Sequence, residues 1–216
     1  MSNTKVVCFD FDGTLGDSFA FVFKSFDYIF YKYLKVHMTQ ELFDKLTGPD
    51  EKGFLLNEFK DQYKEEYWDE YLAYYKENAH KYIKLFPGNY ELLNNLKKKG
   101  YHLVFLTGRS YATATISLKD LDIYDIFEKI YAGSPSACIK DKLLVEVAKE
   151  YKTTPNNVLY IGDSLQDIKD AKAAGSPIIS VLFSNPQWWD EVKKNNPNYV
   201  TNQKDLELRI DEWYQK

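Results

Sequence analysis

Short apolar runs rich in β-branched and aromatic residues recur along this chain and alternate with helical patterns. Each run has the length of a buried strand, and the runs cover residues 5–9, 102–107, 129–133, 158–163 and 178–183. Helical patterns precede the second, fourth and fifth runs, and Gly100 and Gly175 stand where two of these helices should end. Strands that alternate with helices form parallel sheets covered on both faces. We therefore predict a doubly wound α/β fold with a parallel sheet.

The segment between Asp17 and Phe86 interrupts this alternation. It contains no convincing strand, and its aromatic residues follow helical spacing. We expect two aromatic stripes to form its core, one made of Phe19, Phe23, Phe26, Phe30 and Tyr33 and the other of Tyr67, Tyr71, Tyr74, Asn78 and Tyr82. The sequence thus predicts a helical insert within the α/β fold.

The helical insert divides the chain into two expected domains. We predict an α/β core domain of residues 1–16 and 87–216, and an α-helical domain of residues 17–86. A Pro-Gly pair at Pro87 and Gly88 is a turn signal at the point where the chain returns to the core. This pair and the segment near Gly16 are the expected hinges.

Charge and cysteine content narrow the possible partners and compartment. The formal net charge of −4 provides no basic face for nucleic acid. Cys8 and Cys138 lack a CxxC spacing, so we expect two buried free thiols in a reducing compartment. No window approaches the roughly 20 apolar residues of a membrane span, and no signal-peptide core is present. We expect a cytoplasmic protein that binds neither nucleic acid nor membrane.

Polar residues follow three of the predicted strands. Asp10 and Asp12 end the first strand, and side chains two positions apart in a strand point to the same side. The second strand ends in Thr107, Gly108 and Arg109, and the fourth ends in Asp163, with Asp167 four residues later. Because ligands of open parallel sheets bind at the carboxyl ends of the strands, these residues should line one crevice.

Carboxylates, a hydroxyl and an ammonium group at one crevice suit phosphoryl transfer. Mg²⁺ takes oxygen ligands, so Asp10, Asp163 and Asp167 could hold it beside a phosphate and relieve their mutual repulsion. One aspartate can attack phosphorus, while a second donates a proton to the leaving oxygen and later takes one from water. Thr107 and a lysine would hold the phosphoryl oxygens.

These residues resemble the motifs of the haloacid dehalogenase (HAD) superfamily of hydrolases. The resemblance rests on four motifs in matching order and spacing, namely FDFDGT (9–14), LTGR (106–109), a lysine at 140 or 142, and YIGDSLQD (160–167). It covers nearly the whole chain and implies a Rossmann-like core. The helical insert looks like the cap that phosphoglycolate-phosphatase-like members carry after the first motif.

The resemblance implies a role for each aspartate. Asp10 would be the nucleophile and a magnesium ligand, and Asp12 would be the general acid and base, with its main-chain carbonyl on the metal. Asp163 would ligate magnesium directly, and Asp167 would do so directly or through water. Thr107 and the backbone after it would bind the transferring phosphoryl group.

Three cations are further candidates for the site. Lys140 is preferred to Lys142 as the phosphoryl-binding lysine because it lies three residues before the Leu143-Leu144 pair that should anchor its helix, although the Lys-Pro pair common in the family is missing. Arg109 could contact substrate together with Gly108, or form a salt bridge with the cap or its own helix. Lys52 belongs to the loop LTGPDEKG (46–53), which in relatives faces the site and could equally be solvated here.

The resemblance implies a magnesium-dependent phosphatase that hydrolyses a small phosphorylated metabolite through an aspartyl-phosphate, similar to phosphoglycolate phosphatase. Dehalogenases that attack carbon lack the second aspartate, so Asp12 favours phosphate chemistry. A β-phosphoglucomutase-like mutase, a pyrophosphatase and a nucleotidase of the same superfamily remain alternatives. We expect a monomer or a homodimer.

Overall fold

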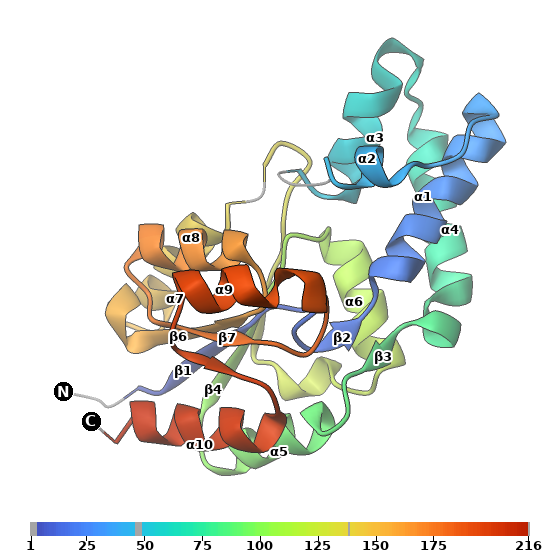
Figure 1. The fold of residues 1–216 in the computed structure, drawn as a ribbon. Helices are drawn as coiled ribbons and strands as arrows, with labels where there is room; N and C mark the ends of the chain where they lie inside the picture. The colour runs from blue at the N-terminus through green and yellow to red at the C-terminus, as the bar shows by residue number, and fades with distance from the viewer. Residues whose placement is uncertain (1–3, 46–48, 138, 216) are drawn as a thin grey trace.

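The computed structural model describes residues 4–45, 49–137 and 139–215, and a six-stranded parallel sheet forms its main body (Figure 1). The strands are β1 (Val6–Phe9), β4 (His102–Leu106), β5 (Lys129–Tyr131), β6 (Val158–Gly162), β7 (Ile178–Val181) and β8 (Tyr199–Val200). Their spatial order is β5-β4-β1-β6-β7-β8, and every neighbouring pair is parallel. The predicted doubly wound fold is confirmed, and the order reverses direction at β1.

Helices cover both faces of this sheet. The helices are α5 (Asn89–Lys98), α6 (Tyr111–Asp120), α7 (Lys140–Glu150), α8 (Leu165–Ala174), α9 (Trp189–Asn195) and α10 (Gln203–Trp213). Val7 and Phe9 of β1 pack with residues of α5, α6 and α10, whereas Val6 and Cys8 pack with residues of α7 and α8. Because both faces of each central strand are buried, the strands read as continuous apolar runs in the sequence.

The described residues of the helical insert form four α-helices, and Figure 1 shows them beyond the carboxyl end of the sheet. They are α1 (Phe19–Leu34), α2 (Gln40–Phe43), α3 (Glu51–Phe59) and α4 (Glu65–Tyr82). Two short antiparallel strands, β2 (Gly16–Asp17) and β3 (Lys84–Leu85), pair where the chain leaves and re-enters the core. One 3-10 turn of the insert spans Lys60–Gln62, and others in the core span Tyr124–Ile126, Pro155–Asn157 and Pro186–Trp188. That the insert is a separate domain is our proposal.

The two aromatic stripes predicted for the insert were partly wrong, because the buried faces of α1 and α4 are rotated relative to the predicted ones. Phe19 and Tyr82 are exposed, and Tyr74 is only half-buried. The buried faces instead consist of Phe21, Val22, Ser25, Phe26, Ile29 and Phe30 on α1, and of Tyr67, Trp68, Tyr71, Tyr75 and Ala79 on α4. Aromatic residues occupy so many positions of these helices that their spacing alone fits more than one face.

Cys8 is a fully buried free thiol at the centre of the sheet, as predicted. Burial raises the pKa of this thiol far above its ordinary value. Cys138 lies outside the described residues. Of the helices described, none combines the length and the apolar character that crossing a bilayer requires.

Candidate active site

The register of the parallel strands brings the polar residues after β1, β4 and β6 to one edge of the sheet. Phe9 of β1 pairs with Phe105 of β4 and with Ile161 of β6. The amide of Asp10 continues this pairing, since it donates to the carbonyl of Ile161 at 2.9 Å. The site therefore lies beside the strand at which the sheet order reverses, where open α/β sheets bind ligands.

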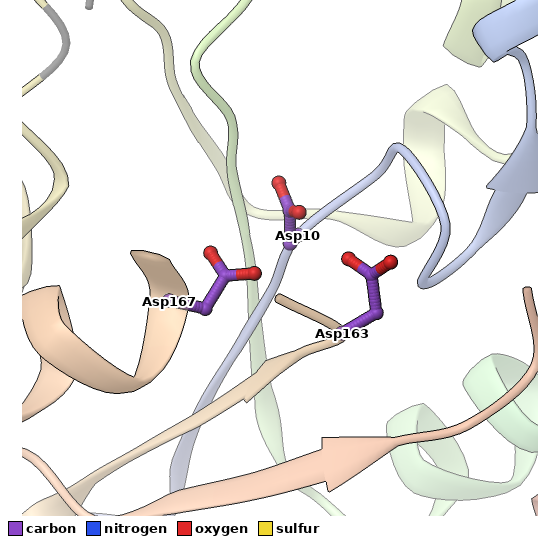
Figure 2. A group of neighbouring side chains, drawn as sticks. All are labelled: Asp10, Asp163 and Asp167. Carbon is purple, nitrogen blue, oxygen red and sulfur yellow. The ribbon is translucent and has the colours of Figure 1, made fainter. Parts of the chain in front are cut away.

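Three carboxylates converge at this edge (Figure 2). Asp10 extends from the end of β1, Asp163 from the loop after β6 and Asp167 from the first turn of α8. One oxygen of each lies within 4.8 Å of the others. Like charges at such distances repel, so the cluster needs a cation or a proton.

Asp167 is already held by four hydrogen bonds. One of its oxygens accepts from Lys140 Nζ at 2.8 Å and from the Tyr160 hydroxyl at 2.7 Å. The other accepts from the amide and the hydroxyl of Ser164, at 3.0 and 2.6 Å. Burial disfavours the charged form, but Lys140 and these hydrogen bonds outweigh it and hold the pKa of Asp167 below its ordinary value. Asp167 thus orients Lys140 and the start of α8.

Asp163 has much weaker compensation. Its nearest described donors are Thr14 Oγ1 at 3.5 Å and Ser184 Oγ at 3.4 Å. Burial, together with the charges of Asp167 and Asp10, raises the pKa of Asp163 well above its ordinary value. Asp163 therefore offers carboxylate oxygens whose negative charge no nearby cation balances. Such oxygens suit a hard divalent cation such as Mg²⁺.

Asp10 lies between the other two carboxylates and one lysine. Lys140 Nζ is 2.9 Å from Asp10 Oδ1, and both residues are less than 10% exposed. Burial raises the pKa of Asp10 to about 7, and the ion pair with Lys140 opposes this shift. Lys142 is exposed on the same helix, so the structure brings Lys140 to the predicted site and leaves Lys142 outside it.

Asp12 points to a different cation. Arg109 donates to it through two nitrogens, with Nε 2.8 Å from Oδ2 and Nη2 2.5 Å from Oδ1, and the Ser18 hydroxyl also donates to Oδ1. Arg109 is only 5% exposed. The ion pair with Asp12 was not predicted from the sequence, and a contact between Arg109 and substrate stays a prediction.

The loop after β4 is tightly packed. Thr107 is fully buried, and its hydroxyl accepts from the Arg109 amide at 3.2 Å. A Cβ on Gly133 would lie 2.1 Å from the Gly108 carbonyl oxygen, so only glycine fits opposite this loop. The packing restricts the backbone of Gly108 in the loop that follows β4.

Lys52, predicted to contact substrate, pairs with Glu65 within the helical insert. Part of its loop, residues 46–48, lies outside the described residues. Its neighbour Glu51 is buried against the start of α6 and was not predicted from the sequence as a site residue. Neither were Ser18, Tyr75 and Ser184. Glu51 gave no signal in the sequence because it follows Asp50 at the start of a helix. Acidic residues are common there, since they interact favourably with the helix dipole.

Comparison with known proteins identifies the family. A family model described as haloacid dehalogenase-like hydrolase matches residues 7–181. The phosphoglycolate phosphatase of Aquifex aeolicus is 28% identical over 89% of this chain and 88% of that enzyme. That of Nitrosococcus oceani is 30% identical, but the match spans only 60% of this chain and 58% of that enzyme.

A solved structure supports the same assignment. The crystal structure of a predicted phosphatase from Clostridium acetobutylicum superposes with a TM-score of 0.75 and 25% identity, over 97% of this chain and 99% of that one. The family model covers most of the chain, including the three strand ends at the site and the start of α7, which carries Lys140. The chain therefore belongs to the haloacid dehalogenase-like hydrolases.

Proposed function

We propose that this chain is a magnesium-dependent phosphatase that hydrolyses a small phosphorylated metabolite through an aspartyl-phosphate. The observation that carries the proposal is the position of Asp10, whose carboxylate lies between Lys140 and two further carboxylates. Asp12 lies two residues further along the chain and forms a separate ion pair with Arg109. The names of the curated relatives favour a phosphoglycolate-like substrate.

Substrate binding would use the residues around Asp10. Lys140, the Thr107 hydroxyl and the backbone amides that follow it would hold the phosphoryl oxygens. Asp10, Asp163 and the main-chain carbonyl of Asp12 would hold Mg²⁺, which neutralises charge on the carboxylates and the phosphoryl group. Asp167 would act through Lys140 and through water, because its own oxygens already accept hydrogen bonds.

The two aspartates would then divide the reaction. A carboxylate oxygen of Asp10 attacks phosphorus as the bond to the leaving oxygen breaks, and the carboxyl group of Asp12 gives that oxygen its proton. Asp12, now a carboxylate, takes a proton from a water molecule that attacks the phosphorus of the aspartyl-phosphate. Inorganic phosphate leaves, and Asp10 and the proton on Asp12 are restored.

The helical insert would close over the substrate and exclude bulk water while Asp10 is phosphorylated. The paired strands β2 and β3 are the two connections between the insert and the core. A Cβ on Gly16 would lie 2.9 Å from the Phe11 ring, so this connection passes directly over the strand end that carries Asp10 and Asp12.

A phosphate-release screen with and without Mg²⁺ tests this function. The panel contains 4-nitrophenyl phosphate, phosphoglycolate, sugar phosphates, nucleotides and pyrophosphate, and Asp10→Asn is the inactive control. We expect magnesium-dependent release from phosphomonoesters by the wild type and none by the variant. Conversion of glucose 1-phosphate to glucose 6-phosphate with little free phosphate would instead identify a mutase, and turnover by Asp10→Asn would contradict the assignment of the nucleophile.

A further inference from the structure

Both oxygens of the Asp12 carboxylate are held by a single guanidinium group. Arg109 reaches it from the loop after β4, across a sequence separation of 97 residues, with contacts of 2.8 and 2.5 Å. The guanidinium carbon lies 5.1 Å from the centre of the Phe11 ring and 5.7 Å from that of the Tyr75 ring. A planar, bidentate donor between two aromatic rings fixes the direction of the carboxylate it binds.

The helical insert supplies one side of this arrangement. Arg109 Nη1 donates to the hydroxyl of Tyr75, which extends from α4 of the insert. The Tyr75 hydroxyl also lies 2.8 Å from Ser117 Oγ on α6, and Ser117 donates to the Thr113 carbonyl at 2.9 Å. Since arginine can only donate, Tyr75 accepts from Arg109 and donates to Ser117, and all the directions in this chain of hydrogen bonds agree.

A second residue of the insert anchors the same region of the core. The buried carboxylate of Glu51 on α3 accepts from the Ser110 amide and from the Thr113 hydroxyl, each at 2.6 Å. Ser110 directly follows Arg109 and caps α6. Glu51 also contributes a favourable charge interaction to the Arg109 guanidinium. A movement of the insert away from the core would remove both the Tyr75 hydroxyl and the charge of Glu51 from Arg109.

We propose that Arg109 is a positioning residue that directs Asp12, and that the Tyr75 hydroxyl makes this positioning depend on docking of the helical insert. The inference rests on the proposed function, in which Asp12 protonates the leaving oxygen. It gives the molecule a way to align the proton donor only when the insert covers the site.

The leaving group of the substrate separates this role from a structural one. An alkyl alcohol leaves poorly without a proton, whereas 4-nitrophenolate leaves readily without one. Misdirecting Asp12 should therefore reduce phosphorylation of Asp10 by an alkyl phosphate much more than by 4-nitrophenyl phosphate. The ratio kcat/KM is the appropriate quantity, because it reports on steps up to phosphorylation and is insensitive to the later hydrolysis.

The test compares Tyr75→Phe with Tyr74→Phe. Tyr75→Phe keeps the buried ring and removes the hydroxyl that binds Arg109, whereas Tyr74 is the adjacent residue of α4 and stacks on Tyr28, away from this chain of hydrogen bonds. We expect Tyr75→Phe to lower kcat/KM for the alkyl phosphate on the order of tenfold and to change that for the aryl phosphate less than about twofold. Tyr74→Phe should leave the alkyl-to-aryl ratio unchanged.

A double-mutant cycle provides the decisive control. In an Asp12→Asn background there is no proton donor to direct, so adding Tyr75→Phe should have no further effect on the alkyl-to-aryl ratio. Equal losses on both substrates, no loss, or the same loss in the Asp12→Asn background would overturn the inference. Absence of hydrolysis of either phosphate by the wild type would instead contradict the proposed function itself.

Discussion

Asp10 and Asp12 point toward the same crevice, yet each has its own cation. Asp10 pairs with Lys140 at 2.9 Å and faces two other carboxylates, while Asp12 pairs with Arg109 at 2.5 Å. The two carboxylates are thus kept in different environments, as a nucleophile and an acid-base group require. The residue-scale predictions concern the charges of this arrangement.

Asp10 should make the stability of the metal-free protein depend on pH. Burial raises its pKa to about 7, so between about pH 4 and that value the folded protein binds a proton that the unfolded chain releases. The wild-type free energy of unfolding should therefore fall, relative to that of Asp10→Asn, as the pH rises from about 5 to about 8. Urea unfolding in a chelator at both pH values measures this difference, and a rise instead of a fall would contradict it.

Asp163→Asn should stabilise the metal-free protein and weaken its response to Mg²⁺. The substitution removes a half-buried carboxylate that faces two others without a close cation. At a given concentration, an ion that binds more tightly stabilises the fold more, so Mg²⁺ should raise the Tm of the wild type more than that of the variant. Asp190→Asn, at an exposed position of α9, is the matched control. A lower Tm of Asp163→Asn than of the wild type in chelator would contradict the claim that the Asp163 carboxylate destabilises the metal-free protein.

Lys140→Met should be strongly destabilising. Lys140 lies 2.9 Å from Asp10 and 2.8 Å from Asp167, and its removal leaves both carboxylates buried without their cation. Breaking a buried ion pair in this way costs about 3 kcal/mol. The same substitution at the exposed Lys142 of the same helix should have a much smaller effect. Equal effects at the two positions, measured by urea unfolding, would contradict the assignment of Lys140 to the site.

At the scale of elements, the start of α3 docks against the core. The amide of Asp50 donates to the Ser134 carbonyl at 3.0 Å, and Glu51 binds the start of α6. Gly53, in the first turn of α3, approaches the core loop so closely that a Cβ there would lie 2.1 Å from the Pro135 carbonyl oxygen. This helix is therefore held by backbone contact rather than by its apolar face alone.

Gly53→Ala tests that contact. Alanine in a helix interior is normally more favourable than glycine by about 1 kcal/mol, but here the added methyl group would push α3 away from the core. We expect a net loss of stability and faster hydrogen exchange at the Ser110 amide, which donates to Glu51. A gain of stability with unchanged exchange at Ser110 would contradict this, because it would show that the loop at Pro135 accommodates the methyl group without displacing α3.

Helices and strands could be predicted from the sequence where the local residue pattern fits only one type of secondary structure. The five longer strands of the sheet are all present, because uninterrupted apolar runs such as VLYIGD have no amphipathic helical alternative. The two-residue strand β8 has no pattern of its own and was missed. The buried face of α4 was assigned to Tyr74 instead of Tyr75, because adjacent tyrosines fit a helical stripe equally well.

At the scale of the whole molecule, the site joins segments that no local pattern relates. Strand-end motifs predicted that the aspartates, Thr107 and a lysine share one crevice, since parallel strands must end at one edge. The ion pair of Arg109 with Asp12 and the docking of Glu51 depend on how loops and the insert pack in three dimensions. Separations of 97 and 59 residues carry no periodicity that would have indicated them.

The phosphorylated enzyme is the intermediate that distinguishes Asp10 as the nucleophile from every other assignment. In Asp12→Asn, 4-nitrophenyl phosphate should still phosphorylate Asp10, because its leaving group needs no proton, while hydrolysis of the intermediate should be slow without the base. Rapid quenching in Mg²⁺ followed by peptide mass spectrometry should then show one phosphoryl group on Asp10. A variant that turns over this substrate without any phosphorylated peptide, or with the group on another residue, would contradict the account.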